Sequence, residues 1–282
     1  MMLINSKTTN RIARTLLWIS ALAVIWILFI ILAYVFVRGI NVVNIDFILG
    51  WPLENWEKGG IFPAIVGTLI LVLVALLFAM PIGVGAAVFL TEFTKKSRVT
   101  AIIFTAADSL NAVPSIVFGL FGLAIFISYL KVGPILLAAG LTLGLMILPT
   151  IIRTSEVAIK NIPRSEKEGS YALGATKLQT IRRIILPGAL PGIVTGVILG
   201  LGRTAGETAP IIFLVTLTPI IPNSLIDPVN ALTYIIYVLA SEATPKRIEV
   251  AFGISLVLIS IVLILNYTAR LLNNYLLRNM RR

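Results

Sequence analysis

Apolar residues in this chain are gathered into six long runs, and polar residues occupy the segments between them. A helix needs about 20 apolar residues to cross a bilayer. The runs are Leu16–Val37, Ile61–Leu90, Ala112–Leu130, Val132–Ile152, Leu190–Pro219 and Val250–Ala269. Only the fifth contains charged residues. The pattern predicts an all-α polytopic membrane protein with six transmembrane helices, the third and fourth joined by a tight turn at Gly133 and Pro134.

The first run follows a basic segment, so it must be distinguished from a cleaved signal peptide. As a helix it covers about 33 Å, which is enough to cross the hydrocarbon core, whereas the apolar part of a signal peptide has only about 7–15 residues. No small-residue cleavage pattern follows the run. We therefore expect a retained transmembrane helix.

The basic residues fall mainly in alternate connecting segments. Segments 1–15, 91–111, 153–189 and 270–282 together hold 17 Lys and Arg residues, and the segments on the other side hold five. Because Lys and Arg concentrate in cytoplasmic loops, both termini of this multi-pass chain are expected in the cytoplasm, which six spans permit.

Three regions follow from this topology. Residues 1–60 should form the cytoplasmic N-terminus, the first transmembrane helix and an outer loop. Residues 61–273 should form a core of five transmembrane helices with a long cytoplasmic loop at 153–189, and residues 274–282 a basic cytoplasmic tail. The larger outer segments contain Pro, Trp and mixed charge, and we expect them to form short ordered caps.

Composition agrees with a membrane protein. Hydrophobic residues make up 58% of the chain and charged residues 12%, with a mean hydropathy of +1.01, whereas a soluble domain carries about 25% charged residues. The net charge of +11 does not indicate nucleic acid as a partner, because the basic residues lie between apolar runs that need membrane lipid. Without Cys or His, thiol catalysis, Cys/His metal sites and the Ser-His-Asp triad are excluded. We expect no catalytic residue, metal or bound cofactor.

The order of residues along the loop at 153–189 is not explained by its positive charge alone. Ser165 and Glu168 fit a helix N-cap with its capping box, small and apolar residues follow, and Gly174 permits a turn. Apolar residues then recur at helical spacing, and Pro187 suits the first turn of the next helix. We expect a short helix, a bend and an amphipathic helix that enters the membrane, a shape suited to a groove on a partner.

This spacing resembles the EAA loop of type I ABC importer permeases, E-A-A-x3-G-x9-I-x-L-P, although Gly169 and Ser170 replace the two alanines. In that family the loop is the coupling helix, which docks into a cleft on a separate ATPase. The resemblance implies ATPase coupling by Glu168, Ala172, Leu173, Gly174, Ile184, Leu186 and Pro187. The chain has no G-x4-G-K-[ST] motif, so ATP and magnesium would be used by the partner and not by this chain.

The fifth run contains one cation and one carboxylate, Arg203 and Glu207. Arg203 lies about 24 Å along a helix from Pro187, within the bilayer, where an unpaired charge is costly. The i, i+4 spacing lets Glu207 pair with it. The pair either locks helix packing or lines a substrate path, and ionisable residues at this depth favour the path. A guanidinium matches phosphate or sulfate oxygens, and Glu207 can accept the proton of hydrogen phosphate, which sulfate lacks.

Small and polar neighbours suit a gated anion path. Thr204 and Thr208 offer hydroxyls, and Pro210 is expected to kink the helix by freeing the carbonyl four residues earlier. Asn111 and Ser115, at the start of the third run, are further candidates for the path, although Asn111 also fits a helix N-cap.

Two polar groups are expected at the cytoplasmic membrane surface. Thr91 and Glu92 end the second run as an interfacial stop, and Arg153, Thr154 and Glu156 begin the long loop as an interfacial charge network.

Three stretches resemble the PstA permeases of the Pst phosphate importer, within a similarity that covers about Gly59 to Asn273. The stretches are Gly59–Thr68, Asn111–Gly119 and Arg203–Pro210. The resemblance implies a prokaryotic inner-membrane permease that imports inorganic phosphate by ATP-driven alternating access. Its partners would be a homologous permease, PstC, an ATPase dimer, PstB, and an extracytoplasmic phosphate-binding protein, PstS. The membrane Arg and Glu of that family correspond to Arg203 and Glu207.

Three alternative functions differ from this one in the transported substrate or in the class of protein. The first is a permease for sulfate, molybdate or another oxyanion. An ion-coupled secondary transporter would need inverted repeats or a relay of acidic or His residues, and the sequence has no clear repeat and one intramembrane carboxylate. A membrane enzyme would have few polar groups at membrane depth to work with. An ABC permease should co-purify with an ATPase, whereas a secondary transporter should work alone.

Overall fold

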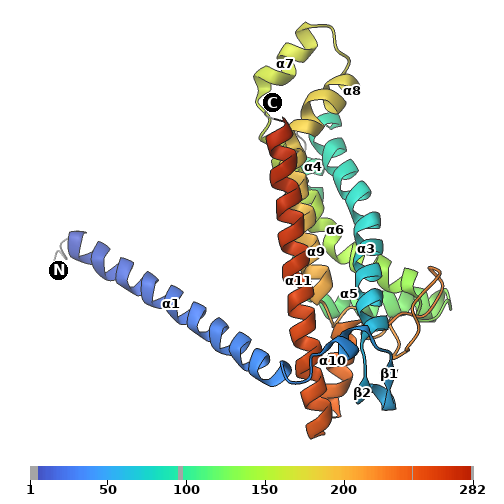
Figure 1. Cartoon of the computed structure of the whole chain (residues 1–282). Helices are drawn as coiled ribbons and strands as arrows, with labels where there is room; N and C mark the ends of the chain where they lie inside the picture. Colours follow the sequence, from blue (N-terminus) through green and yellow to red (C-terminus); the bar gives the residue numbers. More distant parts are fainter. Residues whose placement is uncertain (1–5, 95–97, 243, 281–282) are drawn as a thin grey trace.

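The computed structural model describes residues 6–94, 98–242 and 244–280, and its regular structure is almost entirely helical (Figure 1). The long helices are α1 (Ser6–Gly39), α3 (Phe62–Val88), α6 (Leu136–Lys160), α9 (Leu186–Gly206) and α11 (Pro245–Met280). The shorter helices are α2 (Ile45–Leu49), α4 (Arg98–Asn111), α5 (Ser115–Gly122), α7 (Arg164–Ala172), α8 (Lys177–Thr180) and α10 (Leu232–Ser241). Short π-helical turns adjoin three of the helices, at Phe89–Phe93, Leu123–Tyr129 and Ile181–Ile185.

Five described helical stretches are long and apolar enough to cross a membrane, and a sixth span results if the bent pair of α4 and α5 is counted as one. Five of the six predicted apolar runs lie largely in helices, and the run Leu190–Pro219 is helical only as far as Gly206. The third run, predicted as Ala112–Leu130, matches only α5 and the π-helical turn after it. Helix α4, in the segment 91–111 that was predicted as a cytoplasmic connection, completes the bent pair and meets α5 at an angle of 97°. Pro114 explains the break, since it lacks an N–H and disfavours helix at Val113. Asn111 is thus not the N-cap of α5, whose N-cap is Pro114.

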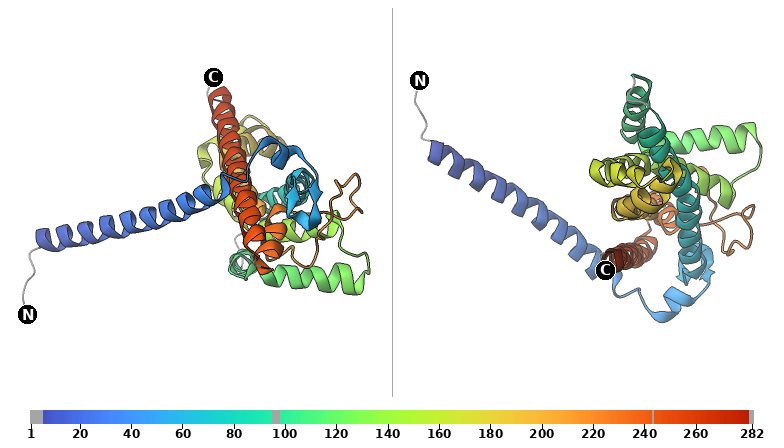
Figure 2. Two further views of the ribbon diagram at one scale, coloured as in Figure 1. Left: turned by 60° about the horizontal axis from the view of Figure 1, so that its bottom comes forward. Right: turned by 90° about the horizontal axis from the view of Figure 1, so that it is seen from above.

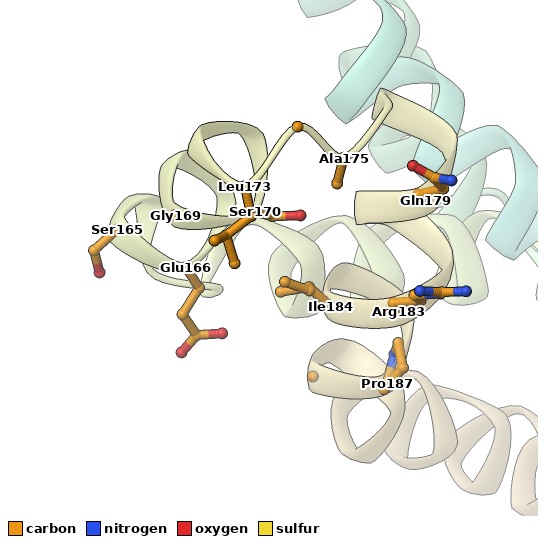
Figure 3. Close-up of a pocket in the computed structure, with 12 residues that line it drawn as sticks. Ser165, Glu166, Gly169, Ser170, Leu173, Ala175, Gln179, Arg183, Ile184 and Pro187 are labelled. Atoms are coloured by element: carbon orange, nitrogen blue, oxygen red, sulfur yellow. The ribbon is translucent and has the colours of Figure 1, made fainter.

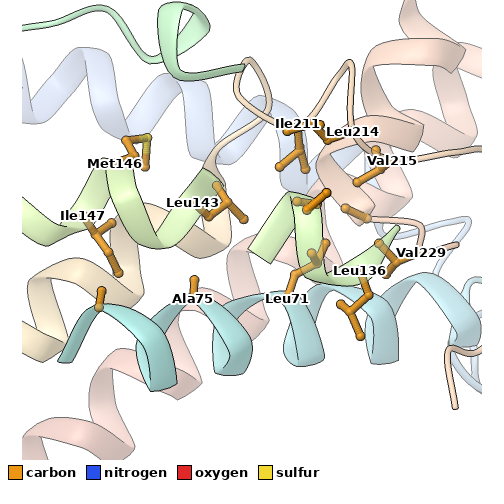
Figure 4. Packing of buried hydrophobic residues seen from close by; sticks show 14 of the residues in the cluster. Leu71, Ala75, Leu136, Leu143, Met146, Ile147, Ile211, Leu214, Val215 and Val229 are labelled. Atoms are coloured by element: carbon orange, nitrogen blue, oxygen red, sulfur yellow. The ribbon is translucent and has the colours of Figure 1, made fainter. Parts of the chain in front are cut away.

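The central packing joins α3, α6 and α9, with the buried side chains of α3 and α6 facing each other (Figure 4). Glycines on α6 allow the approach: a Cβ at Gly140 would lie 2.5 Å from Val74 Cγ1, and one at Gly144 would lie 2.7 Å from Phe78 Cδ1. Small residues at such contacts are typical of helices that pack within lipid. The core includes Leu71, Ala75, Leu143, Met146, Ile147, Ile211 and Leu214.

Helix α1 stands apart from this body and projects away from it in every view (Figures 1 and 2). It meets α11 near its own C-terminal end, where the rings of Tyr34 and Phe252 pack edge to face with centroids 5.4 Å apart. A Cβ at Gly39 would lie 2.6 Å from the Phe252 carbonyl oxygen, so this contact requires glycine. The apolar surface of the rest of α1 is exposed and is suited to lipid or to another subunit.

The segments 38–60 and 220–249, predicted as short ordered caps, contain short helices and one small strand pair. Strands β1 (Pro52–Leu53) and β2 (Lys58–Gly59) pair antiparallel, with Pro52 opposite Gly59, around the 3-10 turn Glu54–Trp56. Trp56 is buried in a cluster that also includes Phe47 from α2, Leu232 from α10 and Ile254 from α11. Arg247 Nε lies 2.7 Å from Glu57 Oε1 and links the two segments.

Candidate functional site

The loop predicted to couple to an ATPase has the predicted shape of a helix, a bend and a second helix. Helix α6 continues to Lys160, and α7 follows after a short turn. Gly174 lies at the bend with φ of +80°, a conformation that favours glycine. Beyond the bend, α8 runs through a π-helical turn into α9. The chain therefore leaves the membrane, turns back and re-enters it within a compact hairpin.

The caps of these helices differ from the prediction. Helix α7 begins after Pro163 without a side-chain cap, so Ser165 lies inside its first turn and the capping box predicted for Ser165 and Glu168 is wrong. Proline at this position has a fixed φ and starts the helix earlier than a serine cap would. The capping box belongs to α8: the Gln179 N–H donates to Thr176 Oγ1 over 3.4 Å, and the Thr176 N–H donates to Gln179 Oε1 over 2.8 Å.

One side of α7 is tied to the rest of the protein, and its C-terminal end is open. Lys167 Nζ lies 2.6 Å from Oε1 of Glu92 in the π-helical turn after α3, and both side chains are mostly buried. The hydroxyls of Ser170 and Thr180 are 2.9 Å apart, which joins α7 to α8. Leu173, by contrast, is 90% exposed. A loop that is held in place and exposes a leucine side chain is suited to insertion into an apolar groove.

A cavity of about 930 Å³ opens between α7 and the start of α9 (Figure 3). Four of the seven predicted coupling residues line it: Leu173, Gly174, Ile184 and Pro187. Glu168 and Ala172 are exposed on α7, and Leu186 packs against the buried cluster around Ile185. The structure thus brings the motif residues into one loop, on the surface that a partner would meet.

The predicted pair of Arg203 and Glu207 is present. Arg203 Nε lies 3.2 Å from Glu207 Oε1, and the two side chains are 35% and 18% exposed. Arg203 is in the last turn of α9, where the free carbonyl ends of the helix favour a cation. Its partial exposure leaves part of the guanidinium open to an anion while the carboxylate balances its charge.

Helix α9 ends at Gly206, so the predicted continuous run to Pro219 and the predicted kink are both wrong. Glu207 is the C-cap and has extended backbone angles, φ −76° and ψ 134°. Residues 207–231 contain no helix. Pro210 accounts for the ending, because it cannot donate to the Gly206 carbonyl and it disfavours helix at the residue before it. The chain therefore leaves the helix beside Arg203.

A third polar residue fixes the backbone of this site. Thr233, from α10, donates from Oγ1 to the carbonyl oxygen of Glu207 over 3.0 Å and is only 4% exposed. Thr233 was not predicted from the sequence, because it lies 26 residues from its partner and belongs to no motif. The Thr204 hydroxyl donates to the Gly200 carbonyl over 2.8 Å, so its proton is used in a hydrogen bond within α9. Thr208 is half-buried in the turn that follows.

The remaining pathway candidates lie on the break between α4 and α5. Asn111 Oδ1 accepts a hydrogen bond from Thr150 Oγ1 of α6 over 2.8 Å, and Ser115 is the half-buried first residue of α5. Neither residue has a hydrogen bond or ion pair with the charged pair in the described part of the chain. Helix α5 reaches that region at Gly119, where a Cβ would lie 2.8 Å from the Pro210 carbonyl oxygen.

The charge network predicted for Arg153, Thr154 and Glu156 is present in part at the C-terminal end of α6: Thr154 donates only to backbone carbonyls of its own helix, and two residues that were not predicted, Lys160 and Asp108, take part. Glu156, 2% exposed, forms ion pairs with both Arg153 and Lys160. Arg153 Nε lies 2.7 Å from Asp108 Oδ1 of α4. The two cations also lie over the Phe104 ring. The network links α4 to α6 near the bend between α4 and α5.

Comparison with known proteins decides the family. Residues 79–282 match the model of the binding-protein-dependent transport system inner membrane component. The chain belongs to this family. Similar permeases include the phosphate transport system permease proteins PstA of Haemophilus influenzae, 32% identical over 94% of this chain and 94% of the relative, and of Yersinia pestis, 33% identical over 94% and 90%. The probable ABC transporter permease protein YqgI of Bacillus subtilis is 29% identical over 98% and 99%. The predicted resemblance to PstA permeases is confirmed.

Solved permease structures confirm the predicted fold of an ABC importer permease. A chain of the inward-facing MetNI methionine ABC transporter matches with a TM-score of 0.63 at 20% identity, over 76% of this permease and 94% of that chain. A chain of a bacterial ABC transporter that imports the acidic polysaccharide alginate matches with a TM-score of 0.57 at 20% identity, over 94% and 99%.

Proposed function

We propose that this permease is the membrane-spanning subunit of an ATP-driven importer of inorganic phosphate. The observation that carries the proposal is the half-open Arg203, held by Glu207 at the point where α9 ends. A guanidinium in a low-dielectric setting binds a tetrahedral oxyanion strongly, because its N–H groups match the oxygens in pairs. The PstA permeases to which the chain is similar are phosphate transport proteins by name, which supports phosphate among the oxyanions.

In this proposal Glu207 has two roles. Between transport events its carboxylate holds the guanidinium, so that Arg203 is never left uncompensated. When the anion arrives, the carboxylate accepts a hydrogen bond from a protonated phosphate oxygen. Sulfate carries no proton at neutral pH and meets only the repulsion between two anions. The pair thus attracts oxyanions and selects the protonated one. Thr208, Asn111 and Ser115 are further proposed members of the path.

The energy comes from a partner in this proposal. The exposed end of α7, with Leu173 at its tip, docks into an ATPase of the PstB type, which binds ATP and magnesium. Closure of the ATPase dimer moves the coupling loops of this permease and of a PstC-type permease together, and the membrane subunits change the side to which the path opens. A PstS-type binding protein delivers phosphate to the outer face. Both termini and the coupling loop lie in the cytoplasm, as the distribution of Lys and Arg favours.

The test is ATP hydrolysis and uptake by the complete complex in liposomes, with the binding protein present and with phosphate, sulfate and molybdate run in parallel. We expect stimulation and uptake with phosphate alone. The Arg203→Ala variant should lose at least about tenfold in phosphate uptake, since a charge-assisted contact contributes about 1.5–3 kcal/mol. Glu207→Gln should reduce the preference for phosphate over sulfate.

Arg270→Gln is the matched control, because it removes an exposed cation of α11 away from the proposed path. Stimulation by sulfate or molybdate in place of phosphate would contradict the proposed substrate and leave the family intact. An unchanged phosphate preference in Glu207→Gln would contradict the role of the carboxylate.

A further inference from the structure

A second cavity, of about 850 Å³, lies on the other side of the coupling loop from the one in Figure 3. It is enclosed by the end of α3, the start of α4, the end of α6 and the start of α7. Four basic residues line it: Arg98, Lys160, Arg164 and Lys167. The single acidic residue in its lining is Glu92. None of the interactions proposed for transport uses this cavity.

The positive charge of the cavity is only partly balanced. Lys167 is paired with Glu92 over 2.6 Å, and Lys160 is paired with the buried Glu156. Arg98 and Arg164 are exposed and form no ion pair with any residue that the structure describes. Two guanidinium groups, contributed by α4 and α7, therefore face a polar space without a counter-ion from the described chain. Guanidinium groups in such a setting favour an anion with several oxygens, such as a phosphate group.

The neighbouring surface indicates where that phosphate group comes from. Leu90 and Phe104 form an apolar floor, and both are 8% exposed. Directly after Arg98, large apolar side chains of α4 recur at helical spacing and are exposed: Val99, Ile102, Ile103 and Leu110. Basic residues above an apolar stripe match the order of headgroup and acyl chain in a phospholipid. The cavity also adjoins the end of the stretch Phe62–Phe93, which is long and apolar enough to cross a membrane.

We propose that this cavity binds the phosphate group of an anionic phospholipid and that the bound lipid bridges α4 and the coupling helix α7. Basic pockets between transmembrane helices on the cytoplasmic side are suited to anionic headgroups. The lipid supplies the counter-ion for Arg98 and Arg164 and adds a second tie, beside the Lys167–Glu92 pair, between α7 and the membrane-embedded core. Free inorganic phosphate offers the same chemistry but leaves the apolar floor and the stripe on α4 uncovered. The inference does not depend on which oxyanion the permease transports.

The test measures lipid retention by the intact transporter complex in native mass spectrometry. The complex is titrated with phosphatidylglycerol and, separately, with phosphatidylcholine of the same acyl chains. We expect selective retention of phosphatidylglycerol. The double variant Arg98→Gln with Arg164→Gln should weaken that retention roughly 25-fold, since each cation contributes roughly a fivefold factor at an anionic lipid surface. The spectrum itself reports whether the variant complex is still assembled.

The matched control is Arg11→Gln with Arg270→Gln, which removes two exposed cations of α1 and α11 outside the cavity and should leave retention unchanged. Equal retention of the two lipids, or equal losses in the two double variants, would overturn the proposal. A third arm adds excess inorganic phosphate. Displacement of phosphatidylglycerol by phosphate would show that the site prefers the free ion and would overturn the lipid assignment. Each readout is a binding measurement, so a failure of phosphate transport would leave the result interpretable.

Discussion

Replacement of Thr233 by valine should impair transport without unfolding the permease. The Thr233 hydroxyl donates to the Glu207 carbonyl over 3.0 Å, and the side chain is 4% exposed. Valine has nearly the same shape, so the packing of α10 is retained while the carbonyl loses its donor. A hydrogen bond of this kind contributes about 1 kcal/mol, and a polar group left buried without a partner costs up to about 3 kcal/mol. The equilibrium between the ordered turn, which holds Glu207 beside Arg203, and its opened form should therefore shift toward the opened form by a factor of about 5 to 150.

The assay for this prediction is phosphate uptake by the reconstituted complex, with thermal unfolding of the same preparation measured in parallel. Thr233→Ser keeps the hydroxyl and loses only a methyl group, so it should transport much more like the wild type than the valine variant does. If Thr233→Val took up phosphate at the wild-type rate, the hydrogen bond would not be positioning Glu207 for transport. If the serine and valine variants were equally slow, packing rather than the donor would explain the loss.

Three further outcomes are expected. Leu173→Asp should abolish phosphate-stimulated ATP hydrolysis, because it places a charge on the 90% exposed tip of the coupling loop; co-purification of the ATPase measures the lost docking. Gly174→Ala should destabilise the bend by about 1 kcal/mol, since φ there is +80°, and weaker ATPase binding would report it. Gly119→Ala should lower the melting temperature, because its Cβ would lie 2.8 Å from the Pro210 carbonyl oxygen; an unchanged melting temperature would contradict that close contact.

Most of the fold follows from local rules that the sequence displays directly. Long apolar runs have to become membrane helices, and the order of small residues, Gly174 and Pro187 predicts the hairpin of the coupling loop. The pairing of Arg203 with Glu207 was predictable for the same reason, because four residues on a helix is a local distance.

The errors arose where proline or distant partners decide the structure. Pro210 ends α9, although the apolar pattern continues through it, and Pro114 separates α5 from α4, a helix in the segment that was predicted as a cytoplasmic connection. Pro163 starts α7 in place of the predicted serine cap. The contacts of Glu207 with Thr233 and of Lys167 with Glu92 join residues 26 and 75 positions apart. Such pairs depend on how helices pack and carry no signal in a single sequence.

The end of α9 at Gly206 has a consequence for how the subunit is solvated. Residues 207–231 form irregular backbone, whose amide and carbonyl groups need partners that acyl chains cannot provide. The chain supplies some of them: the Leu136 N–H donates to the Asp227 carbonyl over 2.9 Å, and the Leu137 N–H donates to the Leu225 carbonyl over 2.9 Å. The remaining groups require water or a neighbouring subunit. This stretch therefore marks the side of the permease that is turned away from the hydrocarbon of the bilayer, and Arg203 stands at its inner edge.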